Sequence, residues 1–274
     1  SYSGADVSNY SVTDQSSTTA NITAKSLTVS GITASDKTYD GSVTATMDGT
    51  AAVYSGLVSG DTFDGSYTGV FSDANVGTGK TVTITPSYSG ADVNNYSVTD
   101  QSTTTADISA KALTATASAS NKTYDGGTTA STTLTFTGLV GSETLGQTVG
   151  STFDNKNVGS NKTVTVNSIT LSDGSGLAAN YSISAGQTTT ANITAKSLTV
   201  SGITASNKTY DGSTNATLDA SLVAYSGLVD GDTFDGTYTG VFSDKNVGTG
   251  KTVTITPSYS GADVSNYSVT DQSS

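Results

Sequence analysis

Hydrophobic and polar residues alternate in short runs along the whole chain. Residues 81–85 read Thr-Val-Thr-Ile-Thr, residues 252–256 read the same, and Leu27 and Val29 alternate with serine and threonine. Since successive side chains of a strand point to opposite faces, each run predicts a strand with one buried face. Turn-forming pairs such as Asp40-Gly41 separate the runs, and no stretch keeps helical spacing for more than a turn. The pattern predicts an all-β chain.

The runs recur in a fixed order. Tyr-Asp-Gly stands at residues 39–41, 124–126 and 210–212, a spacing of about 85 residues. Each copy also carries Asn-Val-Gly, then Lys-Thr-Val-Thr, then an Asn-Tyr pair. Blocks of this size are just large enough for a core of their own. We therefore expect a tandem array of small antiparallel, immunoglobulin-like β-sandwich modules, end to end as a rod, with hydrophobic side chains gathered separately in each module.

Equivalent Ala-Lys pairs at residues 24–25, 110–111 and 195–196 mark the predicted module boundaries. Residues 1–17 are identical to residues 258–274, so the chain starts and stops at the same phase of its repeat. The predicted parts are a C-terminal remnant of a preceding module (1–24), a first module (25–110), a divergent second module (111–195) and a third module lacking its last strand (196–274).

The joints between modules have no linker composition. The stretch from Thr18 to Val29 contains neither proline nor glycine. Ile22 and Leu27 are an odd number of residues apart, so they face opposite sides of a regular strand. Either consecutive cores lie on opposite sides of one long strand, or a bulge or kink lies near Ala24-Lys25. Both alternatives predict a short, stiff joint.

Composition removes most kinds of chemistry. The chain has no cysteine and no histidine, its basic residues are all lysine, and its net charge is −12. Disulfides, a thiol nucleophile and histidine acid–base catalysis are therefore excluded, and a polyanion such as nucleic acid is repelled. No apolar run is long enough to cross a bilayer. We expect no enzyme activity, no catalytic, cofactor-binding or metal-binding residues, and no nucleic-acid partner or membrane insertion in this segment.

The repeated motifs have structural explanations. Asp-Gly in Tyr-Asp-Gly favours a tight turn, because both residues tolerate positive φ. The tyrosine of Asn-Tyr matches the residue that braces a corner of many immunoglobulin-like sandwiches through a hydroxyl–backbone bond. It occurs at Tyr10, Tyr96, Tyr181 and Tyr267. Asn-Val-Gly has the short polar residue and the glycine that a tight loop needs.

Aspartate clusters allow a structural Ca²⁺ as an alternative. Asp61 lies close to Asp64 in the sequence, and Asp230 lies close to Asp232 and Asp235. Carboxylate oxygens are the ligands that Ca²⁺ takes, but no calcium-loop motif is present, and turn chemistry alone also favours aspartate.

Three further residue sets have an alternative function. Lys80, Lys162 and Lys251 recur beside strands and suggest lysine–asparagine cross-links, although each follows glycine or asparagine in a turn, where we expect it to be unburied. Rows of outward threonines resemble ice-binding faces, but the period is wrong for a solenoid. These rows are Thr81, Thr83 and Thr85, and Thr252, Thr254 and Thr256. Exposed tyrosines suggest multivalent sugar or protein binding, with core packing as the simpler explanation. They are Tyr54, Tyr67, Tyr225 and Tyr238.

The motifs together resemble a known family. Lys-Thr-Tyr-Asp-Gly, Asn-Val-Gly-x-x-Lys-Thr-Val-Thr, Asn-Tyr-Ser and Ala-x-Ile-x-Ala-Lys-x-Leu-Thr follow one another as in the tandem YDG modules of large secreted, haemagglutinin-like bacterial adhesins. The resemblance covers the whole chain and brings no catalytic residues. It implies a secreted or cell-surface location and a stalk role in adhesion, biofilm or filament formation.

Three functions stay open at this point. The first is a structural stalk or fibre segment of a bacterial surface adhesin, whose partners are neighbouring repeats of the same long chain. The second is a multivalent binding repeat that recognises sugar or a partner protein on a host or biofilm surface. The third is self-assembly into an extracellular filament, in which the open edge of the third module accepts a strand from another copy.

Overall fold

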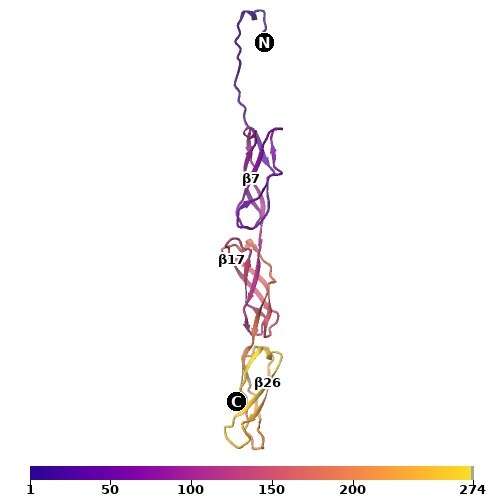
Figure 1. The fold of residues 1–274 in the computed structure, drawn as a ribbon, viewed down its shortest axis with the longest axis vertical. Coiled ribbons are helices and arrows are strands. Elements are labelled where there is room, and N and C mark those ends of the chain that lie inside the picture. The colour runs from indigo at the N-terminus through magenta and orange to yellow at the C-terminus, as the bar shows by residue number, and fades with distance from the viewer. Residues whose placement is uncertain (273–274) are drawn as a thin grey trace. The chain divides into compact units, whose positions relative to one another are not determined.

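The computed structural model describes residues 1–272 and is built from strands and short turns (Figure 1). The helical pieces within that range are 3-10 turns of three residues: η1 (Val7–Asn9), η2 (Val93–Asn95), η3 (Ala178–Asn180) and η4 (Val264–Asn266). None of them is long and apolar enough to span a membrane. The chain is therefore all-β and modular, as the alternation predicts. The predicted third module reaches residue 274, and its last two residues lie outside the described range.

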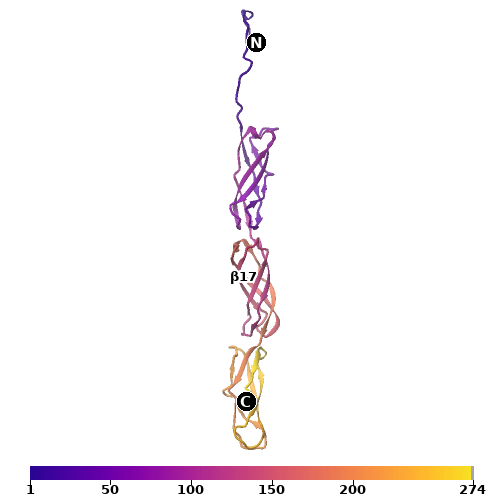
Figure 2. The ribbon, with the colours of Figure 1, turned by 60° about the vertical axis from the view of Figure 1, so that its left-hand side comes forward.

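The chain divides into two compact units, residues 1–109 and 110–274. The first unit holds the N-terminal segment and the first module. The second unit holds the second and third modules together. The N-terminal segment is drawn in indigo without strand arrows in both ribbon views (Figures 1 and 2), and Ile22 in it is fully exposed.

The first module is a sandwich of two sheets. Its strands are β1 (Lys25–Ser30), β2 (Thr33–Ala34), β3 (Lys37–Thr38), β4 (Thr44–Ala45), β5 (Met47–Asp48), β6 (Val53–Ser55), β7 (Asp64–Phe71), β8 (Gly77–Ser89), β9 (Tyr96–Thr99) and β10 (Thr103–Ser109). One sheet has the order β6-β1-β9, the other has the order β3-β10-β8-β7-β4, and β2 pairs with β5. Val29 of β1 and Ile84 of β8 are buried in one cluster, so the sheets enclose a common core.

The second module repeats this plan. Its strands are β11 (Lys111–Ala112), β12 (Thr114–Ala119), β13 (Lys122–Thr123), β14 (Thr129–Ala130), β15 (Thr132–Thr137), β16 (Leu145–Phe153), β17 (Gly159–Asp173), β18 (Tyr181–Ser182) and β19 (Thr188–Thr194). The large sheet has the order β13-β19-β17-β16-β14, and the other strands form the pairs β11-β18 and β12-β15. The long strand β17 runs through the module in both views (Figures 1 and 2).

In the third module the sheet that contains β25 and β26 is smaller than the equivalent sheets of the other two modules. Its strands are β20 (Lys196–Ser201), β21 (Thr204–Ala205), β22 (Asn215–Ala216), β23 (Leu218–Asp219), β24 (Ala224–Ser226), β25 (Asp235–Phe242), β26 (Val253–Ser260) and β27 (Tyr267–Thr270). The sheets have the orders β24-β20-β27, β21-β23 and β22-β25-β26. Within residues 1–272, no strand pairs with β26 on the side where β10 pairs with β8 and β19 with β17.

Each complete module contains two parallel pairs, a detail that the prediction of antiparallel sandwiches omits. In the first module β9 pairs with β1 and β10 pairs with β3, both in parallel. The second module pairs β18 with β11 and β19 with β13 in the same way. Parallel neighbours need a long connection between them. The repeat supplies it because the last two strands of a module return beside its first strands, so each module is closed by its own two ends.

The strand that leaves the second module is interrupted where it enters the third. β19 ends at Thr194 and β20 begins at Lys196. Ile193 and Leu198 are both buried although an odd number of residues separates them. The break at Ala195 corresponds to the predicted bulge or kink, because it lets both side chains turn inward.

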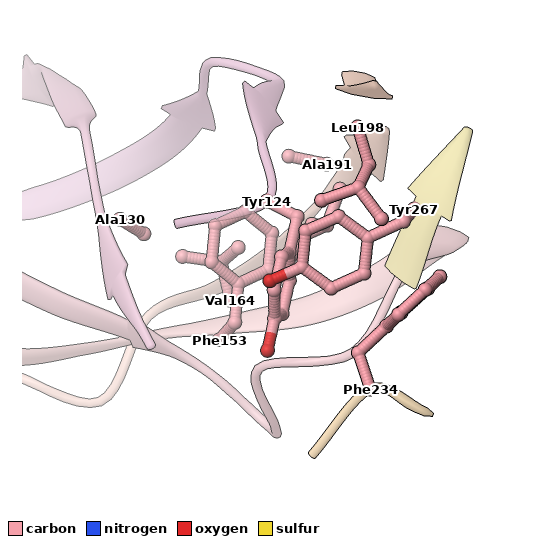
Figure 3. Close-up of a cluster of buried hydrophobic side chains, with 9 residues drawn as sticks. Tyr124, Ala130, Phe153, Val164, Ala191, Leu198, Phe234 and Tyr267 are labelled. Atoms are coloured by element: carbon pink, nitrogen blue, oxygen red, sulfur yellow. The ribbon is translucent and has the colours of Figure 1, made fainter. Parts of the chain in front are cut away.

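The cores of the second and third modules are not separate, contrary to the sequence-based expectation. One buried cluster contains Phe153, Val164 and Ile193 of the second module together with Leu198 and Phe234 of the third. The rings of Tyr124 and Tyr267 connect the two parts (Figure 3), with centroids 5.6 Å apart at 77°. Alternation marks which residues face inward within a module, but it carries no information on contacts between modules.

Candidate functional site at the joint

Polar and aromatic side chains from both modules of the second unit meet at one place, which we name the joint. Its residues are Tyr124, Lys156 and Asn157 of the second module and Asp232, Asp263, Asn266 and Tyr267 of the third. They come from the Tyr-Asp-Gly, Asn-Val-Gly and Asn-Tyr motifs and from the loops that precede β25 and follow β26.

The Tyr-Asp-Gly turn presents Tyr124 to the joint. The N–H of Tyr124 donates to the carbonyl of Thr194 at 2.8 Å, which fixes the turn against the end of β19. Asp125 accepts from the N–H of Gly127 at 2.9 Å and from Lys122 at 2.7 Å. Gly126 has a φ of 79°, the left-handed conformation that glycine adopts without strain. The turn predicted for this motif is confirmed, and its lysine and aspartate form an ion pair across it.

Tyr267 braces a corner of the third module, as predicted for the Asn-Tyr motif. Its hydroxyl accepts from the N–H of Val229 at 2.9 Å and donates to Asp232 Oδ2 at 2.6 Å. The same backbone bond forms between Val58 and Tyr96 and between Val140 and Tyr181. The carboxylate that accepts from the tyrosine is Asp61 in the first module and Glu143 in the second, and the sequence did not reveal this partner.

Asp232 collects bonds from both modules. Its side chain is only 3% exposed, and Oδ2 also accepts from the hydroxyl of Tyr124 at 2.8 Å. Lys156 Nζ lies 3.0 Å from Asp232 Oδ1 and 2.8 Å from Asp263 Oδ1. The lysine also lies over the ring of Tyr124, 5.8 Å from its centroid. A buried carboxylate is costly unless several donors satisfy it, and here two tyrosines and a lysine do so.

Asparagines supply a second, uncharged contact across the joint. Asn266 Oδ1 accepts from the N–H of Val158 at 2.9 Å, and its Nδ2 donates to Asn157 Oδ1 at 3.2 Å. Asn266 is 1% exposed, so its side-chain amide is hydrogen-bonded to these partners in place of water. Close backbone approach adds to the fit, because a Cβ placed on Gly126 would lie 2.8 Å from Val229 Cγ1.

The electrostatics of the joint keep the lysine and both aspartates charged. Hydrogen bonds to Asp263 and Asp232 hold the pKa of Lys156 well above its ordinary value. The bond from Lys156 lowers the pKa of Asp263. Burial acts to raise the pKa of Asp232, but the bonds from the two tyrosines and the lysine outweigh it, and the pKa is lowered. Burial and the bond to Asp232 raise the pKa of Tyr267 to about 12.

The aspartates considered as Ca²⁺ ligands form hydrogen bonds within the protein. Asp61 binds Tyr96, and Asp232 lies in the joint. Over residues 1–272, no group of three or more acidic side chains is arranged to hold a metal ion. The joint itself offers two carboxylates, but Lys156 lies between them at ion-pair distance.

The lysines considered for cross-linking are more buried than the sequence suggested. Side chains of Lys80, Lys162 and Lys251 are 11%, 9% and 18% exposed. Each forms an ion pair with the aspartate seven or eight residues earlier in its loop, at 2.5 to 2.9 Å. The expectation that a turn position leaves these lysines unburied is wrong, because the loop folds back over the aliphatic part of the side chain.

The tyrosines considered for ligand binding are half-buried, not exposed. The hydroxyls of Tyr54 and Tyr67 lie 2.9 Å apart, and those of Tyr225 and Tyr238 lie 3.0 Å apart. Tyr54 also packs edge-on against Phe63 with centroids 5.4 Å apart. These contacts use both the rings and the hydroxyls, so core packing accounts for their repetition.

Sequence reasoning missed most of the joint. Lys156 and Asp263 were given no role, and Asn157 and Asn266 were noted only as parts of the Asn-Val-Gly and Asn-Tyr motifs, which were expected to act within their own modules. One signal was present: Asn-Val-Gly is preceded by lysine at residues 156 and 245 but by Ala74 in the first module. A lysine that changes between otherwise similar loops indicates a contact outside its own module.

Comparison with known families gives one match. The YDG domain matches three times, at residues 23–106, 109–191 and 194–274. The comparisons with curated proteins and with solved structures found no match.

Proposed function

The chain belongs to the YDG domain family, and we propose that it is a structural stalk segment of a bacterial extracellular adhesin or surface fibre. Its role in this proposal is to hold a binding tip away from the cell surface or to build matrix, and it performs no chemistry of its own. A secreted or cell-surface location belongs to the same proposal.

The observation that carries the proposal is the joint between the second and third modules. A stalk needs joints that resist bending, and here a strand passes between modules with one residue out of strand geometry, Ala195. The buried carboxylate of Asp232 receives hydrogen bonds from both modules. Bending this joint would break these hydrogen bonds while the carboxylate of Asp232 stays shielded from water. An unpaired buried carboxylate is costly in free energy.

The chemistry of the repeats supports a mechanical role. Each carboxylate of the joint has a named donor within the protein. The hydroxyls of the tyrosines considered for ligand binding hydrogen-bond to one another in pairs, Tyr54 with Tyr67 and Tyr225 with Tyr238. The net charge of −12 favours solubility and repels polyanions.

The test measures the stiffness of the joint directly. Spin labels on one exposed threonine of the second module and one of the third, at Thr135 and Thr239, report the distance distribution by pulsed electron resonance. We expect a narrow distribution in the parent chain and a much broader one after Asp232→Ala. Lys245→Ala, which changes an exposed lysine outside the joint, is the control and should leave the width unchanged. A broad distribution in the parent chain would contradict a stalk role.

A glycan array with the purified chain separates the stalk from the multivalent binding repeat. The stalk proposal predicts no binding above that of an unrelated acidic protein. Binding that disappears after Tyr54→Phe and Tyr225→Phe would favour the binding repeat instead.

A further inference from the structure

We propose that Lys156 and Asp263 determine which modules can be neighbours at the joint. A module that presents two aspartates there accepts a module whose Asn-Val-Gly loop carries lysine, and it rejects one whose loop carries alanine. The partner of this surface is therefore another module of the same repeat, selected by one residue on each side. This pairing rule rests on the joint that carries the stalk role, and it adds a constraint on module order to that role.

The joint has a constant part that all three modules carry. It consists of the tyrosine of Tyr-Asp-Gly, the asparagine of Asn-Val-Gly and the asparagine of Asn-Tyr. Residues that every module shares cannot distinguish one module from another, so selection must come from positions that vary. The shared residues are Tyr39, Tyr124 and Tyr210; Asn75, Asn157 and Asn246; and Asn95, Asn180 and Asn266.

The variable part has two positions. The residue before Asn-Val-Gly is Lys156 in the second module and Ala74 in the first. The residue that accepts from the N–H of the threonine before β25 is Asp263, and its counterpart in the second module is Ser175. The two positions change together along the sequence, because the loop with alanine precedes the module with serine and the loop with lysine precedes the module with aspartate. A pairing rule predicts such matched changes.

Serine and aspartate do the same work inside their own modules. The N–H of Thr144 donates to Ser175 Oγ at 2.8 Å, and the N–H of Thr233 donates to Asp263 Oδ2 at 3.0 Å. The hydroxyl of each threonine lies near the same oxygen, at 3.2 and 3.3 Å respectively. The fold of this loop therefore does not require a carboxylate, and the aspartate of the third module has another cause.

The second carboxylate oxygen of Asp263 supplies that cause. Oδ2 serves Thr233, which leaves Oδ1 for Lys156 Nζ at 2.8 Å. Asp232 divides its oxygens in the same way, with Oδ1 3.0 Å from the lysine and Oδ2 bonded to the two tyrosine hydroxyls. A serine at residue 263 would offer one uncharged oxygen, which Thr233 would already occupy. Only the aspartate can bind its own loop and the lysine of the preceding module together.

The two aspartates of the joint need this lysine. The side chains of Asp232 and Asp263 are 3% and 10% exposed, and repulsion from Asp263 acts to raise the pKa of Asp232. With alanine in place of Lys156, the two negative charges would lie near each other, shielded from water and without a cation. Such an arrangement costs more than the tyrosine hydroxyls can offset, so a loop like that around Ala74 is rejected.

Exchange of the two residues, singly and together, tests the rule. Lys156→Ala introduces the residue of the first module's loop, and Asp263→Ser introduces the residue of the second module. We expect Lys156→Ala to give roughly twice the parent's width in the distance distribution between spin labels at residues 135 and 239. The double variant should return close to the parent's width, because it removes one charge of each sign. Lys245→Ala, the same change outside the joint, is the control and should match the parent.

Unfolding midpoints of the same chains give a readout that does not depend on stiffness. The rule predicts a reversal of sign: Asp263→Ser lowers the midpoint of the parent, where it removes a partner of Lys156, but raises the midpoint of the Lys156→Ala chain, where it removes a repulsive charge. Damage to the loop alone would lower the midpoint in both chains. Asp263→Asn keeps an oxygen for Thr233 and removes only the charge, so it should show the same reversal.

The outcomes separate the pairing rule from the stalk role. The rule is overturned if neither Asp263→Ser nor Asp263→Asn raises the midpoint of the Lys156→Ala chain, or if Lys156→Ala is as stable as the parent. A narrow distance distribution in the parent would then leave the stalk role standing. A broad distribution in the parent, with the reversal of sign present, would contradict the stalk role and support the rule.

Discussion

Residues 18–24 and residues 189–195 have the same sequence and different structures. The second segment lies almost entirely in β19, between β13 and β17, with Ile193 1% exposed. Among residues 1–272 no strand pairs with the first segment, and Ile22 is fully exposed. Strand propensity is equal in the two, so the difference comes from the sheet that receives the strand. For this repeat, β structure is decided by the available edge and not by the segment itself.

The largest difference between the segments should appear when the same charge is placed in each. Ile193→Asp puts an unpaired carboxylate in the core of the second module, and we expect a loss of roughly 4 kcal/mol or more in the free energy of unfolding. Ile22→Asp should leave the unfolding of the dilute chain unchanged. Urea titration followed by circular dichroism measures both. Comparable losses in the two variants would mean that residues 18–24 are folded against a module.

A second comparison separates the joint from a corner without a lysine. Asp232→Ala leaves two tyrosine hydroxyls without their acceptor and leaves Lys156 paired with Asp263 alone, and we expect a loss of about 3 kcal/mol. Asp61→Ala removes the acceptor of Tyr96 alone and should cost about 1 kcal/mol. Thermal unfolding of the two variants beside the parent gives the difference. If the two losses are equal, the bonds across the joint contribute nothing beyond the corner.

Acid should weaken the joint, and Lys156 should determine how much. The pKa values of Asp232 and Asp263 lie below the ordinary value of 3.8. Their contribution to stability is therefore complete above that value and is lost as the pH falls through the lowered pKa values. Lys156→Met should reduce this acid dependence, and Lys245→Met, which changes an exposed lysine, should not. Unfolding midpoints measured from pH 6 downward, to about pH 2, show whether stability falls with pH as expected. Acid dependence that is unchanged in Lys156→Met would refute the role of Lys156.

The smallest expected effect compares two glycines in the same motif. Gly126 and Gly212 both have a φ of 79°. Alanine at either position costs about 1 kcal/mol for the left-handed conformation. Alanine at residue 126 must also displace Val229, whose Cγ1 would lie 2.8 Å from the new Cβ, whereas nothing lies within 4 Å at residue 212. We therefore expect Gly126→Ala to cost a few tenths of a kcal/mol more. Equal costs in the two variants would mean that Gly126 does not lie against Val229 of the third module.

Much of the fold follows from the sequence, because its causes are local. Alternation identified the inward residues of β8 and β26, and the Asp-Gly turns and the tyrosine corner were confirmed. The parallel pairing of β1 with β9 was not predicted, since register between distant strands depends on how the module closes.

The joint was the least predictable feature. Asp232 looked like a turn aspartate or a calcium ligand, and only its distance to Lys156, 76 residues earlier in the chain, revealed its role. The burial of the turn lysines was mispredicted for a similar reason. Their neighbours in sequence are those of an exposed turn residue, but Lys162 is covered by the loop around Asp154. Sequence shows what each module needs for itself, and contacts between modules need the structure.

Hydrogen exchange of the backbone amides is the most direct test that the receiving edge decides the fate of this strand. In dilute solution residues 188–194 should be protected and residues 17–23 should exchange freely. Protection of residues 17–23, or free exchange of residues 188–194, would contradict the account.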